Sequence, residues 1–122
     1  MNIIKLDSCQ NIIFSKRYGD FTNFTSLILN VRSIITIPNS DEVIVLAMSY
    51  ANNGHTSPLI IRLSPEGDPI WVKRYLFQNL HMSNSYGVFQ NDDEFIVPCK
   101  MAINGGGSAY SSFLRFDYDG TY

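Results

Sequence analysis

Four aromatic residues are candidates for binding a ligand at a surface. Phe14 and Tyr18 lie four positions apart, as do Trp71 and Tyr75, so in extended strands each pair shares one face. Such rings could form platforms on which a sugar stacks, or they could pack between neighbouring sheets. Their exposure decides: carbohydrate binding needs the rings in a solvent-facing pocket, whereas a scaffold needs them buried. For Trp71 we expect packing.

Other reactive groups are scattered along the chain. Asp117 and Asp119 lie in a segment that resembles the opening of a calcium loop, but such a loop needs about twelve residues and ends in a bidentate glutamate. His55 and His81 lack companions at the spacing of a zinc site, and nothing resembles a nucleophile elbow. We therefore expect no catalytic residue, no metal ligand and no cofactor, so the protein is predicted not to be an enzyme.

Composition and charge limit the partners further. With a net charge of −2 and a pI near 5.5, the chain has no positive field for nucleic acid or an anionic membrane. The triplets 16–18 and 73–75, both Lys-Arg-Tyr, have the composition of single-strand binders, but strand alternation sends neighbours to opposite faces. We find no signal peptide and no segment long enough to span a bilayer. Nucleic-acid binding and membrane insertion are therefore not expected, and localisation stays open.

The two cysteines are not expected to form a disulfide. Cys9 falls in a predicted turn, and Cys99 follows an apolar strand. Because these are different positions of the sequence pattern, a disulfide between them is not expected. The sequence predicts two free thiols.

The sequence around these residues is repeated along the chain. Residues 4–18 and 61–75 share six identities at an offset of 57, and a third copy begins at Leu114, 53 residues after Ile61. A second match joins 41–45 to 93–97, identical at four of five positions. The sequence thus predicts one repeat domain over 1–122, with repeats at 1–58 and 59–112 and the start of a third at 113–122.

Each repeat of about 55 residues holds several short strands separated by turns. We predict a hairpin at 2–18, a strand at 33–37 matched by 85–89, and a strand buried on both faces at 43–48. The segments 19–33 and 76–85 are predicted as connections, with glycine-rich loops near residues 54 and 105. Four strands per repeat predict an all-β fold of about two four-stranded antiparallel β-propeller blades, with a sandwich or a β-solenoid as alternatives.

The second repeat carries a family resemblance. Segment 59–75, Leu-Ile-Ile-Arg-Leu-Ser-Pro-Glu-Gly-Asp-Pro-Ile-Trp-Val-Lys-Arg-Tyr, followed by 93–97 and a glycine-rich loop, resembles the blade repeat of large secreted or surface β-propellers of bacteria. The resemblance implies a scaffold or interaction module, secreted or surface-associated if it belongs to a larger propeller, and no active site. Departures are Gln10 for the turn glycine, Phe14 for the tryptophan and Ser64 for the aspartate.

A more distant resemblance is to the quinoprotein dehydrogenase propellers. Gly67 and Trp71 keep the spacing of a glycine and a tryptophan in that family's docking motif. The Thr-Gly of the motif is absent, and Asp117 lies three residues before Gly120 where the motif has four. No cluster of polar groups would hold a quinone and its calcium ion, so we expect packing and no such cofactor.

The number of repeats leads to the functional prediction. Closed propellers need about four to eight blades, so two repeats and a fragment are incomplete as a single chain. Open blades would expose apolar faces and unpaired strand edges, both of which invite association. We therefore predict a non-catalytic structural or interaction module that completes its ring as a homo-oligomer or within a larger protein assembly. The alternative is a lectin-like propeller binding a glycan between blades, through Phe14, Tyr18, Trp71 and Tyr75.

Overall fold

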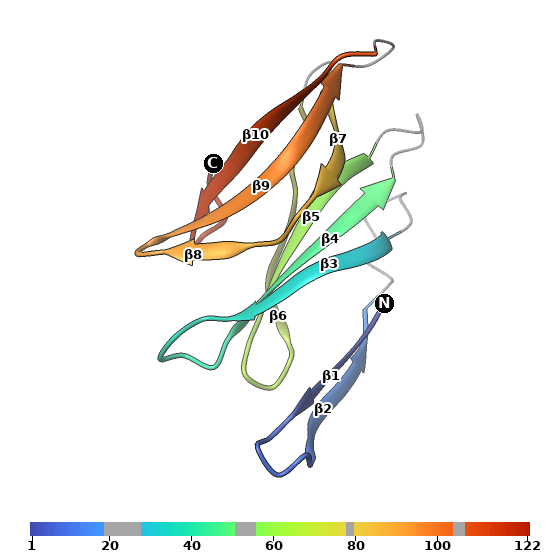
Figure 1. Ribbon diagram of the computed structural model, residues 1–122. Coiled ribbons are helices and arrows are strands. Elements are labelled where there is room, and N and C mark those ends of the chain that lie inside the picture. The colour runs from blue at the N-terminus through green and yellow to red at the C-terminus, as the bar shows by residue number, and fades with distance from the viewer. Residues whose placement is uncertain (19–27, 51–55, 78–79, 104–106) are drawn as a thin grey trace.

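The computed structural model describes residues 1–18, 28–50, 56–77, 80–103 and 107–122 (Figure 1). The described residues form ten strands: β1 Asn2–Leu6, β2 Ile12–Arg17, β3 Ile28–Thr36, β4 Val43–Tyr50, β5 Thr56–Leu63, β6 Pro69–Arg74, β7 Leu80–Ser85, β8 Phe89–Asn91, β9 Glu94–Ile103 and β10 Ala109–Asp117. Within these ranges there is no helix of the length and apolarity needed to cross a membrane. The protein is all-β, which confirms this part of the prediction.

The strands form three antiparallel sheets. β1 and β2 pair as a hairpin, and β3, β4, β5 and β6 follow one another in sequence order across a four-stranded sheet. In the third sheet β10 pairs along one edge of β9, while β7 and β8 pair with successive parts of its other edge. None of the three sheets closes on itself in the part of the chain that the structure describes.

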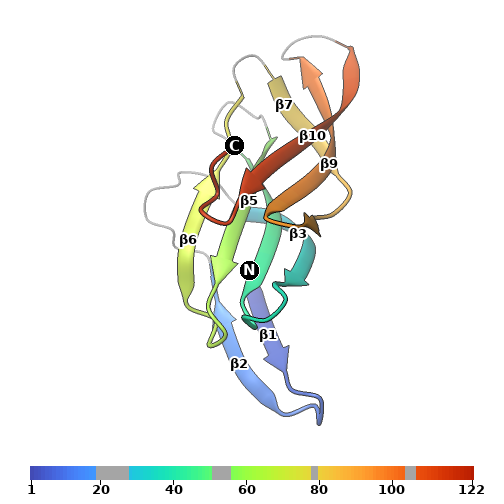
Figure 2. The ribbon, with the colours of Figure 1, turned by 90° about the vertical axis from the view of Figure 1, so that its left-hand side faces the viewer.

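The sheets are stacked face to face, with the β3–β6 sheet in the middle (Figures 1 and 2). Alternation along β4 sends Val43, Val45 and Ala47 toward the β1–β2 hairpin, and Ile44 and Leu46 toward the β7–β10 sheet. All five side chains are buried, which confirms the predicted strand with both faces covered.

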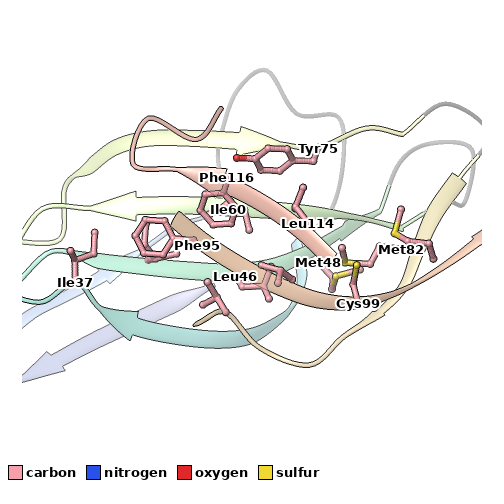
Figure 3. Close-up of a cluster of buried hydrophobic side chains, with 14 residues drawn as sticks. Ile37, Leu46, Met48, Ile60, Tyr75, Met82, Phe95, Cys99, Leu114 and Phe116 are labelled. Atoms are coloured by element: carbon pink, nitrogen blue, oxygen red, sulfur yellow. The ribbon is translucent and has the colours of Figure 1, made fainter. Parts of the chain in front are cut away.

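Two apolar clusters therefore hold the stack together. The hairpin core joins Ile3, Phe14 and Tyr18 to the β3–β6 sheet. The sheet core lies between the two larger sheets, and Figure 3 shows side chains from both of them pointing into it. Its buried members are Ile37, Ile44, Leu46, Met48, Ile60, Tyr75, Met82, Val88, Phe95, Val97, Cys99, Met101, Leu114 and Phe116.

Three predicted boundaries are wrong. β3 begins at Ile28, within segment 19–33, which was predicted as a connection. The sequence did not reveal this part of the strand, because two bulges, near Asn30 and Arg32, interrupt the alternation of apolar residues. β7 occupies Leu80–Ser85, within a predicted connection, where polar residues alternate with Leu80 and Met82. The strand predicted at 85–89 is instead a break between β7 and β8. Residues 54 and 105 lie outside the described ranges.

Candidate functional site

The three hairpin turns of the repeat are built alike. In each, one side-chain oxygen accepts hydrogen bonds from the backbone N–H groups two and four residues later. Asp7 Oδ1 does so at 2.8 Å for both, Ser64 Oγ at 3.2 Å for both, and Asp117 Oδ1 at 3.0 and 2.8 Å. A hydroxyl and a carboxylate can both accept two such bonds, which is why Ser64 can replace an aspartate. Each turn also has one residue at positive φ, namely Gln10, Gly67 and Gly120.

The β1–β2 hairpin packs its second strand against the turn of the next repeat. The Tyr18 hydroxyl donates to the Gly67 carbonyl oxygen at 2.6 Å, and Lys16 Nζ lies 2.6 Å from Asp68 Oδ1. The Phe14 ring covers Gly67 so closely that a Cβ there would lie 2.8 Å from ring carbons. Glycine at this turn is thus required both by φ and by the ring.

The same arrangement recurs one repeat later. The Tyr75 hydroxyl donates to the Gly120 carbonyl oxygen at 2.8 Å, Lys73 Nζ donates to the Asp119 carbonyl, and Trp71 Nε1 donates to the Tyr118 carbonyl at 2.8 Å. A Cβ on Gly120 would lie 3.2 Å from the Trp71 ring. We call these two arrangements the ring-on-turn contacts. They place the predicted residues Phe14, Tyr18, Trp71 and Tyr75 between successive repeats.

These contacts leave little aromatic surface free for a ligand. Phe14, Tyr18 and Tyr75 are only 6%, 5% and 2% exposed, and Trp71 is half-buried against the sheet core. Both tyrosine hydroxyls and the indole N–H already donate to backbone carbonyls. These four residues therefore hold successive repeats together.

Burial also raises the pKa values of the two tyrosines. It raises the pKa of Tyr75 well above its ordinary value, with a further increase from the nearby Asp117 carboxylate, and it raises the pKa of Tyr18, helped by Asp68. A tyrosine in the unfolded chain ionises near pH 10, whereas the buried phenols stay protonated. Above about pH 10 the unfolded state thus binds fewer protons than the folded state, and stability falls as pH rises.

We therefore expect the free energy of unfolding to fall above about pH 10, by up to ~1.4 kcal/mol per pH unit for each buried tyrosine. Denaturant titrations at several alkaline pH values measure it. Tyr75→Phe should make the fall shallower, because the group that ionises on unfolding is gone. The matched control Tyr110→Phe alters an exposed ring and should leave the slope unchanged. Equal slopes in Tyr75→Phe and the unmodified chain would contradict this prediction.

Within the described ranges, the other candidate residues form no common site. Asp117 caps its turn, and no group of three or more His, Cys, Asp and Glu side chains suited to a metal ion occurs among the described residues. Cys9 is exposed and Cys99 buried, both as free thiols, and burial raises the pKa of Cys99. His55 lies outside the described residues.

An ion pair that sequence reasoning missed recurs in two sheets. Arg62 pairs with Glu42 at 2.6 Å, and Arg115 at the corresponding position pairs with Glu94 at 3.9 Å. In the first pair both side chains are 19% exposed, because Arg62 also donates to the Tyr118 carbonyl at 2.8 Å and lies over its ring. In the second pair they are 68% and 50% exposed. The sequence signal is a glutamate that precedes the arginine by a nearly equal number of residues, 20 for Glu42 and Arg62 and 21 for Glu94 and Arg115.

The sheet face that carries Arg115 is exposed, although the equivalent face of the β3–β6 sheet is buried. Phe113 occupies the position of Ile60 in the repeat, yet Phe113 is 67% exposed and Ile60 is fully buried. We call this surface of the β7–β10 sheet the outer face; it consists of Phe89, Glu94, Ile96, Phe113 and Arg115. At the opposite end of the stack, Ile4 and Leu6 are exposed, although the equivalent Ile61 and Leu63 are buried.

Comparison with known proteins adds no relative: no family model, no curated protein and no solved structure matches the chain.

Proposed function

We propose that this chain is a non-catalytic β-propeller segment, a structural or interaction module that completes its ring by self-association or within a larger assembly. The observation that carries the proposal is the outer face. Its residues repeat those of a face that is buried one sheet earlier, but here nothing in the described chain covers them. An exposed apolar surface with the composition of a core face invites a partner.

The order of the strands supports the same proposal. β3 to β6 form an antiparallel four-stranded sheet of the size expected for a blade, and β7 to β10 form another four-stranded sheet, in which β7 and β8 both pair with β9. Successive sheets are joined by the same ring-on-turn contacts, so the relation between one repeat and the next is constant in kind. A structure that grows by one repeated contact closes into a ring if the rotation permits.

The alternative, carbohydrate binding between blades, has less support. Sugar stacking needs an accessible ring face, whereas Phe14, Tyr18 and Tyr75 are buried and their hydroxyls, where present, are engaged. We therefore place these residues in the joint between repeats.

A head-to-tail contact would use the two uncovered ends. Leu114 packs in the sheet core with Ile60, and the corresponding residues at the ends are Ile4 and Phe113. The contact should use these faces and not a third ring-on-turn contact, because Gln10 stands where a docked turn has glycine. Phe113 of one copy is thus expected to lie near Ile4 of the next.

Disulfide trapping tests this contact. In a Cys9→Ser background, we expect an Ile4→Cys chain mixed with a Phe113→Cys chain to form mixed dimers under mild oxidation. The control pairs Ile4→Cys with Leu76→Cys, which is 63% exposed but lies on neither end face. Mixed dimers with Phe113→Cys should exceed those with the control severalfold. Equal yields, or none with either, would contradict self-association through these faces.

A further inference from the structure

The outer edge of β10 lacks the neighbour that its two counterparts have. By the repeat, β10 corresponds to β1 and β5, which pair with β2 and β6. β10 pairs with β9 along one edge, and no strand in the described ranges pairs with the other. Its hairpin turn is nevertheless complete: the Asp117 N–H donates to the Thr121 carbonyl at 3.0 Å, as the Ser64 N–H does to Asp68 at 2.8 Å.

The sequence of β10 also lacks features found in β2 and β6, the strands that cover the corresponding edge in the other two sheets. β2 and β6 each carry a Lys-Arg pair, and β6 begins with Pro69; such residues keep an edge from pairing further. β10 reads Ala-Tyr-Ser-Ser-Phe-Leu-Arg-Phe-Asp, with a single basic residue and no proline. A nine-residue edge without these features is suited to accept another strand.

A cavity of about 460 Å³ runs along this edge. Residues 110–115 of β10 line it from one side, together with Met101 from β9, while Phe77, Leu80 and Tyr122 close it from other elements. In the β3–β6 sheet the place opposite Ile61 is filled by Val72 of β6, which packs on the hairpin core. Leu114 occupies the position of Ile61, so the cavity is where a side chain like Val72 would fit.

We propose that the free edge of β10 binds an extended polypeptide strand of the β6 type, with an aromatic, a lysine and a tyrosine at alternate positions. The strand would lie antiparallel to β10 as a fifth strand of the β7–β10 sheet. Its residue corresponding to Val72 would place a side chain in the cavity. The inference rests on the proposed function only in treating the repeats as equivalent units.

The expected hydrogen-bond pattern follows from β6. The Tyr75 N–H donates to the Pro58 carbonyl at 3.0 Å, and antiparallel bonding alternates, so the N–H of Lys73 faces β5 while that of Val72 faces away. On β10 the positions equivalent to 58, 60 and 62 are 111, 113 and 115. The N–H groups of Phe113 and Arg115 should therefore point to the open edge.

Synthetic peptides test the proposal. The probe has the sequence of residues 69–75, Pro-Ile-Trp-Val-Lys-Arg-Tyr, and its binding to the full chain is measured by calorimetry. One variant is N-methylated on the amide corresponding to Lys73, and its matched control on the amide corresponding to Val72. We expect the probe and the control to bind alike, and the Lys73-type variant to bind at least about tenfold more weakly, because it loses a ladder bond and its methyl group meets β10.

Amide hydrogen exchange on the same samples locates the site. Exchange at Phe113 and Arg115 should be fast in the free chain and slowed by the probe. Binding of all three peptides with equal affinity, or of none, would overturn the proposal. Protection of both amides without peptide would also overturn it, by assigning the edge to a second copy. Peptide binding by a chain that gives no cross-link between Ile4→Cys and Phe113→Cys would leave the edge site standing and refute only self-association.

Discussion

Phe116→Ala is expected to lower the free energy of unfolding by about 3–5 kcal/mol. Phe116 is 2% exposed and lies at the centre of the sheet core. Its ring stacks on Phe95 with centroids 5.2 Å apart and meets the rings of Tyr75 and Trp71 at 5.9 and 6.3 Å. Truncation would leave a cavity between the two larger sheets and remove aromatic contacts from both sides of it.

Phe113→Ala provides the matched control, because it removes the same side chain from the same strand. Phe113 is 67% exposed on the outer face, so in dilute solution its loss should change stability by no more than about 0.5 kcal/mol. Denaturant unfolding of both variants measures the difference. Similar losses for Phe116→Ala and Phe113→Ala would show that the sheets are not stacked as described.

Gly67→Ala is expected to lower the free energy of unfolding by about 2–5 kcal/mol. Gly67 has a φ of 82°, a conformation that costs an L-residue about 1–2 kcal/mol. The added Cβ would also lie 2.8 Å from the Phe14 ring, and relieving that overlap adds about 1–3 kcal/mol. The loss should be accompanied by displacement of Phe14 and Tyr18, visible as changed side-chain resonances.

Two substitutions serve as controls for this prediction. Gly107→Ala adds the same methyl group where no atom lies within 4 Å, so it should be nearly neutral. Gln10→Gly relieves a φ of 68° at the corresponding turn, where no ring is docked, and should stabilise slightly. If Gly67→Ala and Gly107→Ala have equal effects, the ring-on-turn contact does not constrain Gly67.

The matched segments of the repeat were enough to predict the strands that they contain. The matches between 4–18 and 61–75, and between 41–45 and 93–97, placed β1, β2, β5 and β6 and the buried strand β4. Successive side chains of a strand point to opposite faces of its sheet, so the face on which each residue lies is predictable. Ile60, for example, lies in the sheet core, and Ile61 lies in the hairpin core. The pairing of aromatic rings with the next repeat was anticipated only as packing in general.

Other features depend on contacts between distant segments, which a local pattern does not specify. β3 contains two bulges that break alternation, and β7 pairs with β9 although polar residues dominate its sequence. The partner of Tyr18, the Gly67 carbonyl, is 49 residues away, and no property of either residue alone identifies it. Burial of the Arg62–Glu42 pair likewise depends on Tyr118 of the following repeat.

We propose that the stack of sheets ends in apolar faces that associate. The most direct test is to measure the mass of the unmodified chain in solution by light scattering, together with its thermal unfolding, over a range of micromolar concentrations. We predict a mass above the 13.8 kDa of one chain and a melting temperature that rises with concentration. A well-folded 13.8-kDa monomer with a cooperative transition independent of concentration would contradict the claim and favour a self-contained β-sandwich.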